Sequence, residues 1–112
     1  MNDSLSKQFY KIREVSEMLN IPESTLRFWE GKFTILKPRR TAGNTRFYSP
    51  QDIEKIRLIN YLVKEKKMRI DAVEEQLRRD PSGVSRRIDA LNRLKAIRDK
   101  LQTLLNTLNR LH

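Results

Sequence analysis

The sequence predicts a mainly α-helical protein, in which a winged helix-turn-helix domain of four short helices and a small β-hairpin precedes one long coiled-coil helix. Three observations lead to this prediction. Two short helical patterns, 12–19 and 22–32, are separated by a turn of about three or four residues. A basic hairpin pattern follows at 39–48. From residue 84 onward, apolar residues recur three and four positions apart, as in a coiled coil.

The composition favours a polyanionic partner. The 112 residues suffice for one small domain with an appendage, and 24 Lys and Arg against 14 Asp and Glu give a formal net charge of +10. Such a balance points to nucleic acid first and to an anionic membrane surface second. No cysteine is present and the single histidine is His112, so we expect no metal, no cofactor and no thiol chemistry.

The chain has no pattern typical of a membrane or secreted protein. No apolar run approaches the ~20 residues of a membrane-spanning helix. The N-terminal segment contains no apolar signal region. We therefore expect no membrane partner and a bacterial cytoplasmic, nucleoid-associated location.

The N-terminal part is expected to begin with a polar, disordered arm at 1–9, followed by a helix at 12–19 with its apolar residues on one face. Asn20 suits the position after that helix, because asparagine tolerates the left-handed backbone conformation found there. Pro22 fits the first turn of the next helix, 22–32, where its missing N–H group has no cost. These two helices form the predicted helix-turn-helix.

The wing is predicted from breaks in the helical pattern. Pro38 stops any helix and favours extended backbone in the residue before it. The sequence Ala-Gly-Asn at 42–44 favours a tight turn, because glycine and asparagine accept a positive φ angle. Two short strands, 39–41 and 45–48, are expected on either side of this turn.

Two further helices are predicted after the wing. Ser49 is a strong helix start, since its hydroxyl can cap the N-terminus while the following proline takes the first helical position. This third helix is expected to extend to residue 64. A basic link then leads to a fourth helix at 70–79.

The sequence Asp-Pro-Ser-Gly at 80–83 is the one clear internal boundary, so we divide the chain into a winged domain at 10–80 and a dimerisation helix at 84–112. The chain has no second copy of the apolar stripe of this last helix, so we expect the stripe to lack an intrachain partner and to form a homodimer. A chain ending at Asp80 should then fold by itself as a monomer. The stripe consists of Val84, Ile88, Leu91, Leu94, Ile97, Leu101, Leu104, Leu108 and Leu111.

The stretch 21–48 contains the residues best suited to a polyanion. Its basic residues are interrupted by a single acid, Glu30, and aromatic side chains lie among them. A helix followed by a basic hairpin can place one projection in a groove and the other along the phosphates. The basic residues are Arg27, Lys32, Lys37, Arg39, Arg40 and Arg46.

The order of these motifs resembles a known family. The similar segments are YKIREV at 10–15, STLRFWE at 24–30, KPRRT at 37–41, GNTRFY at 43–48 and SPQDI at 49–53. They look like the first helix, the recognition helix, the wing and the third helix of MerR-type winged helix-turn-helix transcription regulators. The chain departs from the family at Phe28 and Trp29, where two tyrosines are common. A phenylalanine has no hydroxyl with which to bind phosphate.

The resemblance implies an antiparallel coiled-coil dimer that binds an inverted repeat in double-stranded DNA and distorts the promoter, with RNA polymerase as a further candidate partner. It also implies that Arg27 reaches DNA from the recognition helix, that Arg46 holds a phosphate, and that Tyr48 packs beneath the wing. The candidate DNA-binding residues are Ser24, Thr25, Arg27, Phe28, Lys37, Arg39, Arg40, Asn44, Arg46 and Tyr48.

Each of these assignments has a structural alternative. Short helices must bury their aromatic residues to hold together, so we expect Phe28, Trp29 and Phe33 to belong to the core instead of stacking on bases. Arg27 could be a surface charge paired with an acid on its own helix, such as Glu23. The basic residues of the last helix are typical of a solvated helix face.

The leading hypothesis is a homodimeric, sequence-specific DNA-binding transcription regulator that acts on an inverted-repeat operator. The alternative is an architectural or chromosome-anchoring DNA-binding protein with the same winged fold. A third hypothesis is an adaptor that binds anionic membranes or acidic proteins through the basic last helix. We do not expect an enzyme, because the sequence contains no catalytic constellation and no phosphate-binding glycine loop.

Overall fold

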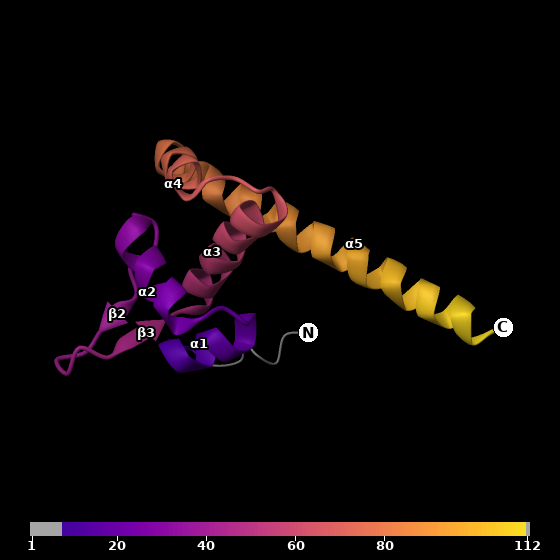
Figure 1. The fold of residues 1–112 in the computed structure, drawn as a ribbon, viewed down its shortest axis with the longest axis horizontal. Helices are drawn as coiled ribbons and strands as arrows, with labels where there is room; N and C mark the ends of the chain where they lie inside the picture. The colour runs from indigo at the N-terminus through magenta and orange to yellow at the C-terminus, as the bar shows by residue number, and fades with distance from the viewer. Residues whose placement is uncertain (1–7, 112) are drawn as a thin grey trace.

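The computed structural model describes residues 8–111, so most of the predicted arm at 1–9 and His112 lie outside the described residues. The molecule measures 57 × 30 × 23 Å, because its last helix projects away from the packed N-terminal part (Figure 1). In chain order the elements are β1 (Tyr10–Lys11), α1 (Ile12–Leu19), α2 (Glu23–Lys32), β2 (Arg39–Arg40), β3 (Arg46–Tyr48), α3 (Pro50–Asn60), the π-helical turn η2 (Tyr61–Glu65), α4 (Ile70–Arg79), the 3₁₀ turn η3 (Pro81–Gly83) and α5 (Val84–Arg110).

Helices α1 and α2 confirm the predicted helix-turn-helix. Asn20 takes the left-handed conformation expected after α1, with φ 55° and ψ 46°. The turn is closed by the Ser16 hydroxyl, which donates a hydrogen bond of 2.6 Å to the carbonyl of Ile21. Pro22 stands just before the first helical residue, Glu23, and not in the first turn itself. Its extended ψ of 144° bends the chain into α2.

A third strand joins the predicted wing. Strands β2 and β3 pair antiparallel with Arg40 opposite Arg46, and Asn44 in the connecting turn has a φ of 64°. On its other edge β3 pairs with β1, which the sequence analysis missed, and here Tyr10 lies opposite Tyr48. A strand of two residues has no alternating pattern by which to recognise it. This strand joins the wing to the start of α1.

Helix α3 begins as predicted and ends differently. The backbone N–H of Asp52 donates to the Ser49 hydroxyl at 3.1 Å, and the Ser49 N–H donates to the Asp52 carboxylate at 3.0 Å. The α-helical pattern stops at Asn60, whereas we expected it to continue to residue 64. The chain then forms one wider π-helical turn, in which the Lys66 N–H donates to the carbonyl of Tyr61 at 3.1 Å.

The core is a single cluster beneath the wing and between the helices. Trp29 and Phe33 pack edge to face with ring centroids 6.2 Å apart. Helix α4 covers one side of this cluster and is joined to α2 by the Lys32–Asp71 ion pair. The largest fully buried side chains are Trp29, Tyr48, Phe33, Leu26, Ile53, Ile56, Ile59, Leu77, Val15 and Val73.

The start of α5 belongs to this core. Val84, Ile88 and Leu91 are only 5–8% exposed, because they pack in the hydrophobic cluster to which α3 also contributes. The expectation that the whole stripe lacks an intrachain partner was therefore wrong for these three residues. A chain ending at Asp80 would lose part of its own core. From Leu94 onward the apolar side chains of α5 are exposed.

We predict different effects for two isoleucines of α5, of which Ile88 is 8% and Ile97 is 56% exposed. Ile88→Ala should lower the free energy of unfolding by ~2–5 kcal/mol, because it leaves a cavity in the core. Ile97→Ala should change the intrinsic stability of the fold by only about 0.5 kcal/mol. Urea unfolding at several protein concentrations measures both and separates folding from association. Equal, concentration-independent losses would contradict this division of α5.

Candidate nucleic-acid interface

Helix α2 has one buried and one exposed face. Leu26 and Trp29 are buried, whereas Ser24, Arg27 and Phe28 point to solvent. Phe28 is 56% exposed, so the expectation that it belongs to the core was wrong, although Trp29 does lie there. The residue-by-residue spacing explains the difference, since positions three and four apart share a helix face. The exposed face carries three of the residues expected to contact DNA, Ser24, Arg27 and Phe28.

Arg27 is held only loosely. Its guanidinium donates to the Glu23 carboxylate at 3.1 Å, and the two side chains are 50% and 38% exposed. Pairs of this kind contribute only about 0.3–0.5 kcal/mol, so Arg27 can exchange Glu23 for another anion at little cost. Of its neighbours, Ser24 is exposed and Thr25 is half-buried. The structure thus leaves Arg27 available on the helix surface.

The wing is attached to α2 by one carboxylate, that of Glu30. Arg46 donates from Nε to both carboxylate oxygens, at 3.0 and 2.8 Å, and Arg40 pairs with the same group. Arg40 also donates to the side-chain oxygen of Asn44 at 2.8 Å. The Glu30 side chain is only 11% exposed and that of Arg46 only 20%. These wing residues lie together as predicted, but two of them are already paired with an acid.

Tyr48 supports the wing from beneath. The residue is 1% exposed, and its hydroxyl has no hydrogen-bond partner among the described residues. Burial, followed by the nearby Glu30 carboxylate, raises the pKa of Tyr48 to about 12. Its position agrees with the packing role that the family resemblance implied. It corrects the inclusion of Tyr48 among residues that touch DNA.

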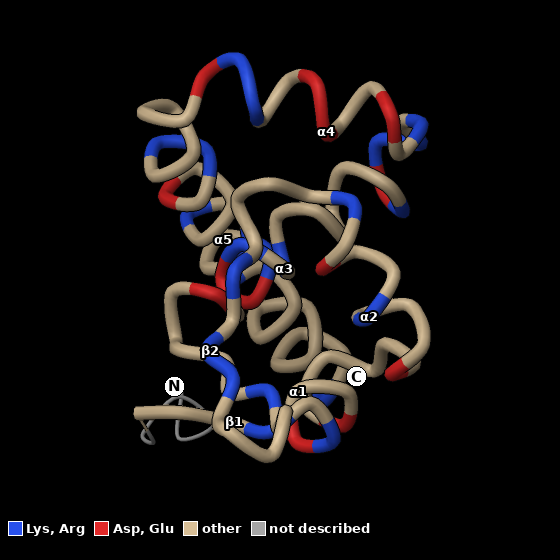
Figure 2. The backbone as a smooth tube through the Cα atoms, turned by 90° about the vertical axis from the view of Figure 1, so that its left-hand side faces the viewer, with Lys and Arg blue, Asp and Glu red and all other residues tan. Residues whose placement is uncertain are grey.

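Two basic residues of the connector and wing remain accessible. Lys37 is exposed and makes no ion pair or hydrogen bond with the part of the chain that the structure describes. Arg39 is also exposed, and its guanidinium lies 5.4 Å from the ring centre of Phe9. This cation–π contact joins the end of the predicted arm to the wing. Figure 2 shows basic residues along β2. Arg39 lies on the face of the wing opposite to Arg40, because neighbouring strand residues point to opposite sides.

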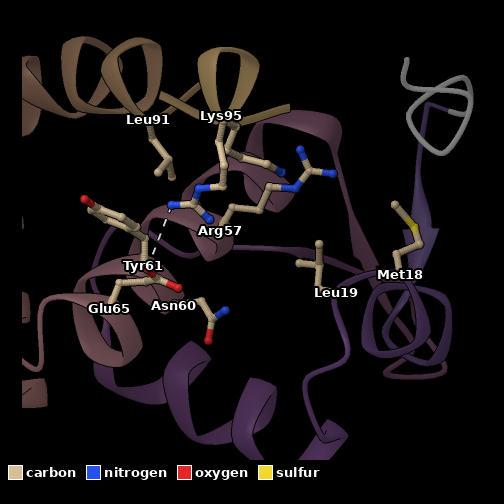
Figure 3. Close-up of a pocket in the computed structure, with 9 residues that line it drawn as sticks. Met18, Leu19, Arg57, Asn60, Tyr61, Glu65, Leu91 and Lys95 are labelled. Atoms are coloured by element: carbon tan, nitrogen blue, oxygen red, sulfur yellow. Dashed lines mark ion pairs between the residues drawn. The ribbon is translucent and has the colours of Figure 1, made fainter. Parts of the chain in front are cut away.

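A second basic region lies where α1, α3 and α5 meet. A hollow of about 280 Å³ is lined by Arg57 from α3 and by Lys95 and Arg98 from α5 (Figure 3). Arg98 lies 3.9 Å from the Glu65 carboxylate of η2. Nothing in the sequence pattern placed these three cations together, because they approach one another only through the packing of α5 on α3.

Within residues 8–111 no three His, Cys, Asp or Glu side chains are arranged as a metal site. No helix in that same range is long and apolar enough to cross a membrane.

A helix-turn-helix with a basic wing beside its second helix defines a winged helix-turn-helix protein. The chain belongs to the family described as MerR HTH family regulatory protein, which it matches over residues 10–80. The sequence motifs had predicted this family. No solved structure matches the chain.

Several curated proteins are similar to part of the chain. It is 32% identical over 72 residues to the HTH-type transcriptional repressor CarA of Myxococcus xanthus, covering 63% of this chain and 25% of that protein. It is 42% identical over 50 residues to the HTH-type transcriptional regulator MlrA of Escherichia coli and of Salmonella typhimurium, covering 45% of this chain and 21% of each relative. The chain therefore spans about a quarter of the length of these relatives.

We predict that Glu30 contributes to stability by attaching the wing. Glu30→Gln should lower the free energy of unfolding by about 1–3 kcal/mol, because it leaves the largely buried Arg46 without its charged partner. Glu23→Gln is the matched control and should cost at most about 0.5 kcal/mol, since it removes only an exposed partner of Arg27.

A double-mutant cycle that combines Glu30→Gln with Arg46→Met should give a coupling energy of about 0.5–3 kcal/mol in denaturant unfolding. Additive effects, or equal losses for Glu30→Gln and Glu23→Gln, would refute the attachment.

Proposed function

We propose that the chain is a sequence-specific DNA-binding transcription regulator that acts as a homodimer on an inverted repeat in double-stranded DNA. The observation that carries this proposal is the exposed face of α2, which presents Ser24, Arg27 and Phe28, while the connector and wing expose Lys37 and Arg39 without an acidic partner among the described residues. A helix of this size fits the major groove, and cations at its side can bind the flanking phosphates. Family membership and the formal net charge of +10 support the same function.

The second apolar face of α5 supports the homodimer. At ~100° per residue, the exposed apolar residues from Leu94 to Leu111 lie roughly a third of a turn away from the buried Val84, Ile88 and Leu91. They form a separate stripe that is 40–76% exposed in one chain. An apolar face of this length is unfavourable in water, and a second copy would cover it. Leu105, 51% exposed, widens this face and was missing from the predicted stripe.

The distribution of charge along α5 favours an antiparallel pair. Residues 101–109 carry no charge, whereas 86–100 contain two acidic residues and several basic ones. A parallel pair would place the two basic halves side by side. An antiparallel pair places each basic half beside an uncharged half and so reduces repulsion. The basic residues are Arg86, Arg87, Arg93, Lys95, Arg98 and Lys100.

Distortion of promoter DNA and contact with RNA polymerase complete the proposal by analogy with the family. Two winged domains held by one coil bind DNA as a unit, so the second half-site is bound at a raised effective concentration. The spacing at which the coil holds the domains then acts on the DNA between the half-sites. Selection of bound DNA from a random library, followed by titration against scrambled DNA, tests the function as a whole.

An architectural or chromosome-anchoring role is the second candidate, because the basic hollow with Arg57, Lys95 and Arg98 adds charge away from the α2 face. A ratio of affinities near one for selected and scrambled DNA would favour this role. Binding to anionic liposomes without binding to DNA would instead favour the membrane adaptor.

We predict that Arg27 reads sequence and Lys37 holds the backbone. Arg27→Ala should weaken binding to the selected site by ~1–3 kcal/mol, because its guanidinium contacts a guanine edge there. It should weaken binding to scrambled DNA much less. Lys37→Ala should weaken both DNAs alike and reduce the dependence of log affinity on log salt by about one unit per contact. Fluorescence titrations at several salt concentrations measure these effects. Equal losses on both DNAs for Arg27→Ala would exclude it as a reader.

We predict that a charge in the second stripe of α5 abolishes the dimer. Leu101→Lys should yield a folded monomer that loses ~10²–10⁴-fold in affinity for the inverted repeat, because the advantage of linked binding is lost. Gln102→Lys adds the same charge one residue away on the same helix and should remain dimeric. Light scattering gives the mass, and titration gives the affinity. A monomeric parent chain, or a Leu101→Lys variant that stays dimeric, would disprove this arrangement.

A further inference from the structure

Phe28 is unusual for its position. Among the described residues before α5, it is the one large hydrophobic side chain that is exposed, at 56%. One exposed phenylalanine is not remarkable by itself in a folded protein. Phe28, however, lies on the α2 face proposed to bind DNA, directly after Arg27. Unlike the tyrosine common in the family, it has no hydroxyl with which to bind a phosphate.

Gly31 adds no side chain to the α2 surface near Phe28. It lies on the same exposed face, one helical turn after Arg27 and Phe28, and a Cβ atom added there would meet nothing within 4 Å. Its φ angle is not positive, so neither its backbone nor its packing requires glycine. The contrast is Gly83, where a Cβ atom would collide with the Asp80 carboxylate.

Glycine inside a helix destabilises it relative to alanine, so Gly31 has a cost that the fold itself does not explain. Side chains of a helix lean toward its N-terminus, and a side chain at position 31 would lie over Arg27 and Phe28. Because glycine has no side chain, another molecule can approach the α2 backbone closely at this position.

We propose that Phe28 reads thymine by apolar contact with its 5-methyl group in the major groove, and that Gly31 provides the clearance for this contact. The inference rests on the proposed function, in which α2 binds double-stranded DNA. The thymine methyl is the apolar group that the major groove presents, and cytosine lacks it. Arg27, the adjacent residue, supplies the polar contact to guanine. Each half-site therefore contains a thymine close to a guanine.

The test uses the full chain and the DNA site that it selects from a random library. Deoxyuridine replaces each thymine in turn, which removes only the 5-methyl group and leaves every hydrogen-bonding group in place. The parent chain should lose affinity about fourfold at one position of a half-site, and over tenfold when both half-sites are changed. Phe28→Ala should bind the thymine and deoxyuridine sites equally. Ser24→Ala, on the same face, should keep the full methyl effect.

Gly31→Ala gives an independent readout. It should raise the midpoint of thermal unfolding, because alanine favours the helix, and it should weaken binding to the thymine site severalfold. If Gly31 had only a structural role, the midpoint of thermal unfolding and the affinity for the thymine site would rise or fall together. Retention of full affinity by Gly31→Ala would overturn the clearance role.

The outcomes separate this inference from the proposed function. A parent chain that prefers its selected site but is indifferent to every deoxyuridine leaves the function standing and overturns the thymine contact. The thymine contact is also overturned if Phe28→Ala still binds the thymine site more tightly than the deoxyuridine site. It is overturned as well if Phe28→Ala loses the same affinity on every DNA, as a contact with deoxyribose would give. A chain that selects no sequence removes both proposals together.

Discussion

The packing of the first turns of α5 against α3 fixes the direction of the long helix relative to α2. Val84, Ile88 and Leu91 enter the same core that holds Trp29 of α2, so the two elements belong to one body. Helix α3 also contacts β3, which joins the wing to that body. One face of α5 therefore completes the domain, and a second face, rotated by roughly a third of a turn, remains for a partner.

Glu30 has the corresponding role for the wing. A carboxylate beside a DNA-binding surface weakens the attraction of phosphates, so its presence within a basic cluster needs a structural reason. The reason is that it holds Arg46 by two hydrogen bonds and Arg40 by an ion pair, and so fixes the wing against α2. Because Glu30 pairs with both Arg40 and Arg46, the wing has less unpaired positive charge than its count of arginines suggests. Lys37 and Arg39 are the cations of the connector and wing that have no acidic partner among the described residues.

Local signals in the sequence predicted much of the fold. Asn20 and Ser49 marked helix ends because capping depends on residues only a few positions apart. Strand β1 and the burial of Val84 were missed because both depend on residues far away along the chain. The exposure of Phe28 could have been predicted, since its spacing places it with Arg27 and away from Leu26 and Trp29. A prior expectation that aromatic residues are buried outweighed that spacing.

The phase slip in the apolar stripe has a structural meaning. The slip falls between Leu91 and Leu94, which is where the apolar residues of α5 pass from the core to solvent. A continuous stripe would have given α5 a single face, so pairing with a second copy would have competed with packing on α3. Because the slip turns the later residues away from α3, both contacts can form at once. In the proposed dimer, the distance between the two α2 helices is then set by rigid packing, without a flexible linker.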